Sequence, residues 1–155
     1  KIKSIAYTLR PGAYAILPRN GSLLLTHQAA PTPEFQLPGG GIDKGESSIA
    51  ALHREVIEET GWRISRPVFL HAIRRFVFMP DYDIWAEKLC KIYIARPIRC
   101  LGNPTETDHT AKWVCTKNVL NYLKNPGDKA AVSQYFDPCT QVKLQKYHRG
   151  SLCRD

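Results

Sequence analysis

The sequence has no apolar segment that approaches the roughly 20 consecutive residues needed to span a lipid bilayer. The first residues, Lys1-Ile2-Lys3-Ser4, include no apolar stretch followed by a cleavage site, as a secretory signal would require. We therefore expect a soluble protein with a cytoplasmic location and no membrane partner. With 155 residues, 43% of them hydrophobic and 23% charged, the chain is long enough to build one domain with a substantial core.

Cysteine is sparse and widely spaced in this chain. The five cysteines are an odd number, and no two of them form a CxxC pair. This pattern argues against a disulfide framework and against a structural zinc site, and it suits a reducing compartment. Cys90 and Cys115 lie in apolar, strand-like segments, so we expect both thiols to be buried.

Acidic residues are outnumbered, and their placement is uneven. The formal net charge is +8, yet residues 40–62 hold five acids against Lys44 and Arg54, so this segment carries −3 and the rest of the chain +11. An acidic patch within a basic protein suits a metal site that must attract polyphosphate. The same balance suits contact with an RNA backbone, and ordinary solubility charge explains it equally well.

Residues 40–62, GGIDKGESSIAALHREVIEETGW, carry the strongest pattern in the chain. Glu55, Glu58 and Glu59 are three and four residues apart, which places their carboxylates on one face of a helix. Like charges at this spacing repel each other unless solvent or a cation lies between them. Carboxylate oxygens are the ligands that Mg²⁺ prefers. A solvated amphipathic helix would account for the glutamates, but not for the preceding glycines or for Arg54.

This segment also predicts where the helix begins and ends. Ser47 is a suitable N-terminal cap and Gly61 a suitable C-terminal stop, so the helix is expected from about Ser47 to Thr60. Ile49, Leu52 and Val56 recur at helical spacing and should form its apolar face.

The segment resembles the Nudix box at every defining position. The matching pattern is Gly40, five residues, Glu46, seven residues, Arg54-Glu55-Val56-Ile57-Glu58-Glu59, one residue, Gly61 and an apolar residue. Trp62 occupies that last position, where the family more often has an aliphatic residue. The resemblance implies an α/β fold, the Nudix-type α/β/α sandwich with a mixed central sheet. It also implies a pyrophosphohydrolase that cleaves the diphosphate linkage of a nucleotide or nucleoside diphosphate derivative with Mg²⁺ or Mn²⁺.

The same resemblance suggests roles for individual residues. It makes Glu58 and Glu59 direct metal ligands, makes Glu55 a ligand or the general base, and adds the backbone carbonyl of Gly39 to the metal shell. Arg54 joins the catalytic set because a guanidinium can neutralise and orient a glutamate through paired hydrogen bonds. Direct contact between Arg54 and a phosphate is the alternative.

The family often recruits a further acid from a loop that precedes a late strand. Glu106, in the sequence TETDHTAKW, stands in such a position, and we expect it to act as an additional ligand or base. His109 in the same loop is a second candidate for the base, because an imidazole can accept and release a proton in general acid–base catalysis. An isolated loop histidine is more often only solvated, so exposure of His109 is the expected outcome.

Substrate contacts are less well defined by the sequence. Phe35 could stack on a nucleobase, and Arg74, from the pair Arg74-Arg75 on a predicted strand, could reach a phosphate. A small-molecule nucleotide is the expected substrate, from the nucleoside triphosphate, ADP-ribose or dinucleoside polyphosphate class. An RNA 5′-end pyrophosphohydrolase and a non-catalytic nucleotide- or RNA-binding Nudix module are the alternatives, and the oligomeric state stays open.

Strand-like and helical segments alternate along one predicted domain, residues 1–137. Strands are expected at 12–18, 22–27, 35–37, 67–78, 84–95 and 111–115, with a turn at Asn20-Gly21 and a long hairpin through residues 79–83. Thr116 should cap a helix over 117–124, and Asn125-Pro126-Gly127 should separate it from a helix over 128–136. Residues 138–155 contain few apolar residues and are predicted to form a basic tail.

Overall fold

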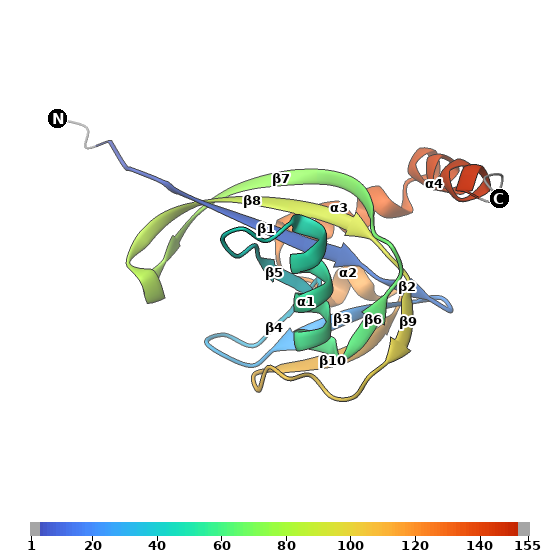
Figure 1. The fold of residues 1–155 in the computed structure, drawn as a ribbon, viewed down its shortest axis with the longest axis horizontal. Coiled ribbons are helices and arrows are strands. Elements are labelled where there is room, and N and C mark those ends of the chain that lie inside the picture. The colour runs from blue at the N-terminus through green and yellow to red at the C-terminus, as the bar shows by residue number, and fades with distance from the viewer. Residues whose placement is uncertain (1–3, 152–155) are drawn as a thin grey trace.

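The computed structural model describes residues 4–151 and consists of short strands, two long hairpin strands and four α-helices (Figure 1). No helix in this range is long and apolar enough to cross a bilayer. The strands are β1 (Thr8–Ile16), β2 (Pro18–Arg19), β3 (Ser22–Gln28), β4 (Glu34–Gln36), β5 (Gly39–Gly41), β6 (Trp62–Ile64), β7 (Val68–Met79), β8 (Ile84–Ile94), β9 (Pro97–Cys100) and β10 (His109–Cys115). The helices are α1 (Ser48–Thr60), α2 (Val119–Tyr122), α3 (Pro126–Phe136) and α4 (Pro138–Ser151), with a 3₁₀ turn η1 at Pro80–Tyr82.

One of the two four-stranded sheets is mixed, as predicted. Its strand order is β5-β1-β8-β7, in which β1 runs parallel to β8 while β1 with β5 and β7 with β8 pair antiparallel. A second, antiparallel sheet has the order β10-β3-β2, with β4 added to β3. Strands β6 and β9 form a separate antiparallel pair close to the end of α1. The long hairpin of β7 and β8 confirms the predicted strands at 67–78 and 84–95.

Helix α1 has the caps that the sequence predicted. The hydroxyl oxygen of Ser47 accepts a hydrogen bond from the backbone N–H of Ala50 at 3.1 Å. Gly61 ends the helix in the left-handed conformation, with φ of 75°, and its N–H donates to the carbonyl of Ile57. The buried face includes Leu52 and Val56 but not Ile49, which is 38% exposed, because the helix meets the sheets through Ala51 instead.

Strand β1 divides the core into two layers because successive side chains of a strand point to opposite faces. Ala13 and Ala15, followed by Leu17, pack with Leu52 and Val56 of α1. Ile16 packs on the other face, in a cluster that contains buried residues of α2 and α3. Small alanines under α1 let the helix lie close to the sheet, which brings its glutamates near the backbone of β5.

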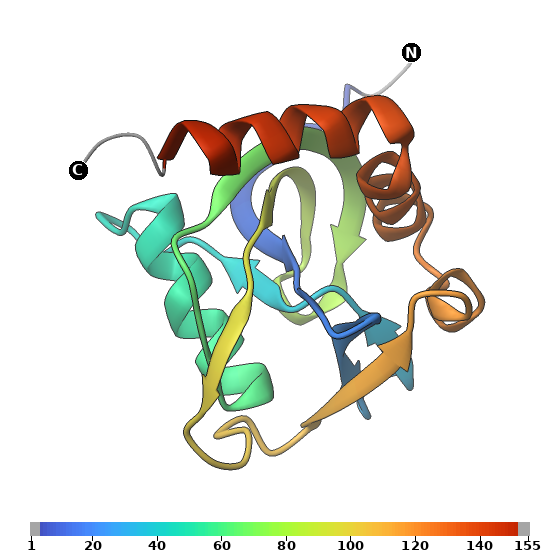
Figure 2. The ribbon, with the colours of Figure 1, turned by 90° about the vertical axis from the view of Figure 1, so that its right-hand side faces the viewer.

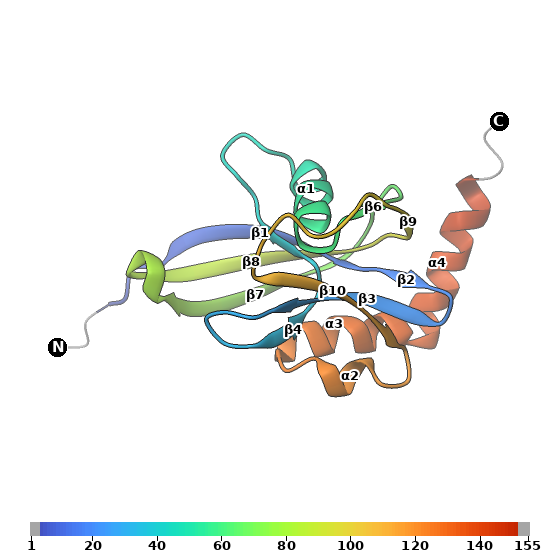
Figure 3. The ribbon, with the colours of Figure 1, turned by 90° about the horizontal axis from the view of Figure 1, so that it is seen from below.

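The helices therefore cover both faces of the strands, which confirms the predicted α/β/α arrangement. Figure 3 shows α1 on one side and α2 and α3 on the other. Figure 2 shows α4 lying across one end of the curled strands, next to α3. A hydrogen bond from the side-chain amide of Gln141 to the carbonyl of Tyr135 joins these two helices.

Three predictions about the C-terminal part and the cysteines need correction. Thr116 does not cap a helix: α2 is a single turn preceded by Asn118, which makes no side-chain cap. Asn125 separates α2 from α3 as predicted, but α3 begins at Pro126 rather than at residue 128, because the Asn125 side chain accepts from the N–H groups of Gly127 and Asp128 and Pro126 fits the first turn. Cys90 is buried as expected, but Cys115 is exposed because it lies on the solvent-facing side of β10.

The predicted basic tail contains a helix that the sequence analysis did not assign. Residues 138–151 form α4, and residues 152–155 lie outside the described range. Only one face of this helix packs against the rest of the molecule, so the segment needs few apolar residues. That low apolar content is the reason the segment was predicted to be a tail. The division into a domain at 1–137 and a tail at 138–155 stays a prediction.

Gly61 and Gly21 offer a matched test of how tightly the end of α1 is packed. Both have φ near +75°, but a Cβ at Gly61 would clash with the carbonyl oxygen of Gly102, whereas nothing lies within 4 Å of a Cβ at Gly21. We expect Gly21→Ala to lower the free energy of unfolding by about 1 kcal/mol, and Gly61→Ala to lower it by roughly 1–3 kcal/mol more. Urea unfolding measures both; equal losses would show that the contact with Gly102 is not tight.

Candidate active site

Arg54 lies at the centre of the acidic residues and pairs with several of them. Its Nε and one terminal nitrogen contact the two carboxylate oxygens of Glu46 at 2.9 and 3.0 Å. The other terminal nitrogen lies 2.7 Å from Glu55 Oε1 and 3.1 Å from Glu58 Oε2. The guanidinium also donates to the carbonyl of Gly41 at 3.1 Å. These contacts occupy one oxygen each of Glu55 and Glu58, while the role of Arg54 in orienting the glutamates stays a prediction.

These contacts shift the protonation of the groups involved. Hydrogen bonds from Arg54, together with the N–H of Asp43, lower the pKa of Glu46 to about 2. Burial raises the pKa of Glu55, and the hydrogen bond from Arg54 opposes that rise. The hydrogen bond with Glu46 is the main reason that the pKa of Arg54 is raised. The guanidinium is therefore a fixed positive charge within the cluster.

Glu59 is the most deeply buried of the glutamates, with 5% exposure. Its Oε2 accepts a hydrogen bond from the backbone N–H of Gly39 at 3.0 Å, so the residue expected to offer a carbonyl to a metal lies directly beside it. Burial, followed by the nearby charges of Glu55 and Glu106, raises the pKa of Glu59 to about 9. A bound cation would stabilise the ionised form of this carboxylate, which burial and the negative neighbours disfavour.

Gly40 gives Glu55 the space that it occupies. A Cβ built on Gly40 would lie 2.5 Å from the carboxyl carbon of Glu55, so any larger residue there would displace the carboxylate. Gly39, next to it, has φ of 141°, and a Cβ on it would clash with the carbonyl oxygen of Ala13. The glycines before the helix therefore allow the backbone of β5 to approach both β1 and the glutamates.

Glu106 reaches the cluster through backbone contacts at the end of α1. The N–H groups of Thr105 and Glu106 donate to the carbonyl of Glu58 at 2.9 and 3.0 Å, and the N–H of Leu101 donates to the carbonyl of Gly61 at 2.8 Å. The loop thus satisfies carbonyls that the last turn of a helix leaves without intrahelical partners. As a result, the structure brings Glu106 next to the helix glutamates, as expected from its position in the sequence.

His109 is not solvated, contrary to the expectation for a loop histidine. It is 8% exposed, its Nδ1 lies 2.9 Å from the hydroxyl of Thr26, and its Nε2 lies 3.2 Å from Glu106 Oε2. Its Nδ1 is also 3.6 Å from Glu59 Oε1. Pairing of β10 with β3 places His109 in the interior, where it contacts both Glu106 and Glu59.

The carboxylate oxygens are spaced closely enough to bind one divalent ion together. One oxygen each of Glu55, Glu58 and Glu106 lie within 4.8 Å of one another, and so do ligand atoms of Glu59, Glu106 and His109. Oxygens on opposite sides of a Mg²⁺ ion with bonds of about 2.1 Å are roughly 4.2 Å apart, so small adjustments would close this set around one ion. The donor set is rich in oxygen, as Mg²⁺ and Mn²⁺ prefer.

A small cavity of about 150 Å³ opens between β7, β8 and the start of α3. Tyr14, Arg75, Asn125 and Asp128 are among the residues that line it. Asp128 accepts a hydrogen bond from the N–H of Leu37 at 3.2 Å, and burial raises its pKa to about 6. Asn125 caps α3 with its side-chain oxygen, which leaves its amide N–H₂ available to a ligand.

The segment Leu37–Gly39 connects this cavity to the acidic cluster. Leu37 bonds to Asp128 at one end, and Gly39 bonds to Glu59 at the other. Two residues of extended chain span about 7 Å, so the two sites are neighbours. Tyr14 also lies between them: burial raises its pKa, and the charges of both Asp128 and Glu59 add to that rise.

The residues predicted to bind substrate lie outside this cavity. Arg74 is 62% exposed and pairs with Glu87 at 3.0 Å, whereas Arg75, on the opposite face of β7, lines the cavity. Phe35 packs edge-on against Tyr122 at 5.1 Å, because alternation along β4 turns its neighbours Glu34 and Gln36 to the cavity instead. The sequence analysis chose Arg74 from the pair Arg74-Arg75, because strand alternation alone does not say which of the two faces the cavity. It missed Asp128, for which the only available signal was the helix-start pattern Asn-Pro-Gly-Asp.

A family model of the NUDIX domain matches residues 8–136, which is most of the chain. This chain belongs to the Nudix family. The match extends from β1 to the end of α3 and so includes the glutamate cluster, the loop with Glu106 and the small cavity.

Relatives with known names support an enzyme. A protein of Bacillus subtilis (strain 168) named as an 8-oxo-dGTP diphosphatase is 30% identical over 141 residues, covering 91% of this chain and 89% of the relative. An RNA pyrophosphohydrolase of Cereibacter sphaeroides (strain ATCC 17029 / ATH 2.4.9) is 32% identical over 95 residues, with 56% of this chain and only 57% of that protein covered. The chain is therefore a Nudix hydrolase, and the non-catalytic alternative loses its support.

Solved structures agree on the fold. A NUDIX hydrolase from Nitrosomonas europaea superimposes with a TM-score of 0.69 at 18% identity, covering 83% of this chain and 88% of that one. The MutT NUDIX hydrolase from Burkholderia pseudomallei has a TM-score of 0.65 at 25% identity, covering 82% and 98%.

The raised pKa of Asp128 predicts a pH-dependent stability. Burial favours the neutral carboxyl, whose stabilising contribution is complete below pH 3.8 and is lost as the pH rises through about 6. Asp128→Asn stays neutral and keeps an acceptor for Leu37. The free energy of unfolding of the parent, relative to this variant, should therefore fall by on the order of 1–3 kcal/mol between pH 4 and pH 7. Urea unfolding across this range measures it; a constant difference would contradict the assigned burial.

Proposed function

We propose that this Nudix hydrolase cleaves the diphosphate linkage of a nucleotide, using Mg²⁺ or Mn²⁺ held by the glutamate cluster. The observation that carries the proposal is the convergence of Glu55, Glu58 and Glu106 within 4.8 Å, with the buried Glu59 beside them. The nucleotide class includes nucleoside triphosphates, ADP-ribose and dinucleoside polyphosphates. The small cavity beside the cluster is the proposed place for part of the nucleoside.

The proposed metal ligands are the carboxylates of Glu55, Glu58 and Glu59 and the carbonyl of Gly39, with Glu106 as a further ligand. Their fit is supported by the high pKa of Glu59, which burial raises most and which the negative charges of Glu55 and Glu106 raise further, so a bound cation would favour its ionised form. A bound divalent ion supplies charge neutralisation for the phosphates and lowers the pKa of water in contact with it. The glutamates hold that charge between α1, β5 and the loop with Glu106, and the more exposed side chains of Glu58 and Glu106 mark the side from which a phosphate chain can reach it.

The protein must also accept a proton from the attacking water. Glu55 is the preferred base, because burial raises its pKa and so makes its carboxylate a stronger proton acceptor. Arg54 donates a hydrogen bond to Glu55 Oε1 at 2.7 Å, and no hydrogen bond to the other oxygen is found among the described residues. Glu106, with 45% of its side chain exposed and a contact to His109, is the alternative base. In either case Arg54 acts by orienting carboxylates.

The nucleoside contacts follow from the lining of the small cavity. Its volume of about 150 Å³ corresponds to only a few water molecules, so it admits part of a nucleotide and leaves the phosphates outside. Asn125 offers amide hydrogens, and Asp128 changes from donor to acceptor as the pH rises through about 6. Arg75 supplies positive charge at the same cavity. These groups suit the polar edge of a base or a sugar hydroxyl, whereas Arg74 and Phe35 remain predictions without such placement.

A 5′-phosphorylated RNA end is the second candidate substrate. The relatives named RNA pyrophosphohydrolase favour it, as does the charge of +11 outside residues 40–62. An RNA with a 5′-triphosphate belongs in the same assay as the free nucleotides. Faster release from RNA than from any free nucleotide would make the RNA end the preferred substrate.

The direct test is phosphate and pyrophosphate release from a panel of nucleotides in Mg²⁺, with the products identified. Glu58→Gln keeps the shape of the side chain but removes a metal-binding charge, so activity should fall by at least about 100-fold. Asp81→Asn makes the same charge change in the exposed turn η1 and should leave activity unchanged. Equal activity of Glu58→Gln and the parent would reject the metal role assigned to Glu58.

A further inference from the structure

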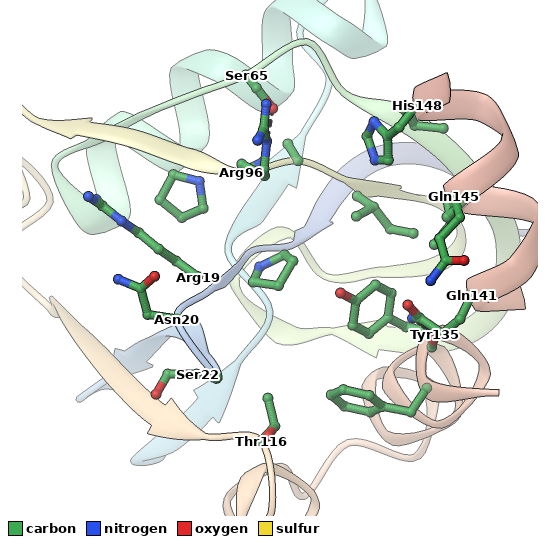
Figure 4. Close-up of a pocket in the computed structure, with 18 of the residues that line it drawn as sticks. Arg19, Asn20, Ser22, Ser65, Arg96, Thr116, Tyr135, Gln141, Gln145 and His148 are labelled. Carbon is green, nitrogen blue, oxygen red and sulfur yellow. Dashed lines mark hydrogen bonds between the residues drawn. The ribbon is translucent and has the colours of Figure 1, made fainter. Parts of the chain in front are cut away.

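A second, larger cavity of about 790 Å³ is lined by none of the residues of the acidic cluster or the small cavity. Its walls come from the turn between β2 and β3, the segment before β7, the connection from β8 to β9, and one face of α4. Figure 4 shows Arg19 and Asn20 on one side of this space, Arg96 and Ser65 above it, and His148 and Gln145 of α4 on the opposite side. The large cavity is therefore separate from the proposed hydrolytic site.

The lining of this large cavity is positively charged. Arg19, Arg66 and Arg96 all contribute to it, and no aspartate or glutamate is among its described lining residues. All three arginines are exposed, and within residues 4–151 none of them forms an ion pair with a carboxylate. Arginines without acidic partners in a concave surface create a local potential that attracts phosphates.

Aromatic side chains flank the same surface. A neighbouring cavity of about 390 Å³ shares Arg19, Asn20 and Ser22 with the large one and adds Trp62 and Trp113. The two indole rings meet edge-on at 5.4 Å, and the Arg19 guanidinium lies 5.2 Å from the centre of the Trp62 ring. Trp113 is 37% exposed, so part of its ring is open to a stacking partner.

Helix α4 completes the surface with polar groups. Gln141, Leu144, Gln145 and His148 line the large cavity, and their spacing of three, four and seven residues places them on one helical face. The amides can donate to and accept from sugar hydroxyls and unpaired bases. Tyr135 and Phe136, at the end of α3, add two rings to the same wall.

We propose that these two adjoining cavities form a binding surface for single-stranded nucleic acid. The two cavities share Arg19 in their lining and have volumes of about 790 and 390 Å³, and adjoining cavities favour an extended ligand. Arginines would track the phosphodiester backbone, and open aromatic rings would stack on bases that no complementary strand covers. This surface contains no metal ligand, so binding needs neither a divalent ion nor the hydrolytic activity proposed above.

The test is fluorescence anisotropy with a 12-nucleotide uridine RNA that carries a 5′-hydroxyl and a 3′-fluorescein, in EDTA. The 5′-hydroxyl leaves no diphosphate to cleave, so failure of hydrolysis and failure of binding are distinguishable. The binding constant should fall with salt, with a logarithmic slope of about −2 for three arginine contacts. Arg19→Ala/Arg96→Ala should weaken binding by roughly 10-fold or more and reduce the slope by about 1.4.

Matched variants distinguish binding at this surface from nonspecific attraction of RNA to the positive net charge of the protein. Lys124→Ala/Lys129→Ala removes the same charge from exposed positions outside both cavities and should leave the slope nearly unchanged. Trp113→Ala should weaken binding by about 10-fold, and Trp113→Phe should retain most of the affinity because a ring remains. Arg19→Gln/Arg96→Gln, which keeps the side-chain bulk, should match the double alanine variant.

Further arms identify the ligand. The same measurement with DNA of the matching sequence compares the two polymers. Binding of either one supports the proposal, and the polymer with the lower dissociation constant is the preferred ligand. The proposal would be overturned if no RNA bound at a low salt concentration of about 50 mM, where phosphate contacts are strongest. It would also be overturned if duplex RNA bound as tightly as the single strand. A third contradiction would be displacement of the RNA by uridine monophosphate at the concentration at which the RNA itself binds. Equal losses in the two double variants, at the arginines and at the lysines, would also overturn it.

Discussion

Contact between one guanidinium and three carboxylates is the interaction on which the acidic site depends. Arg54 reaches Glu46 with two hydrogen bonds and Glu55 and Glu58 with one each. Without it, acids stacked on one helical face would repel each other. One positive charge cannot balance all of these acids, however, and among the described residues Arg54 makes no hydrogen bond or ion pair with Glu59, whose pKa burial raises to about 9, or with Glu106. The site is therefore stable enough to form while keeping negative charge for a cation to neutralise.

The backbone around the helix holds this charge in place from both ends. Before the helix, Gly39 donates to Glu59, and Gly40 leaves room for Glu55. After it, the loop with Glu106 closes on the carbonyl of Glu58. These contacts couple the acidic cluster to the sheets and to the small cavity, because the same short segment that carries Gly39 also bonds to α3. The proposed catalytic site and the proposed nucleoside site are thus joined by one short segment of backbone.

Local sequence patterns predicted the ends of α1 and the shared face of its glutamates, because interactions between residues close in the chain determine both. Ser47 and Gly61 marked the ends of α1 through capping, and the glutamate spacing predicted a shared face. Tertiary packing decided the rest: pairing of β10 with β3 buries His109, and alternation along β7 sends Arg75 rather than its neighbour to the cavity. The cavity residue Asp128 was missed because its partner is 91 residues away in the chain. Nothing in the local sequence records such a contact.

A crystal soaked in Mn²⁺, with anomalous scattering measured at the manganese edge, tests the central claim most directly. At least one anomalous peak is predicted within about 2.5 Å of carboxylate oxygens from Glu55, Glu58 and Glu59. Arg54 should keep its contact with Glu46 in that crystal, since the cation takes up the charge that the guanidinium leaves unbalanced. Full Mn²⁺ occupancy elsewhere, with no peak among these glutamates, would contradict a metal-dependent site on this helix.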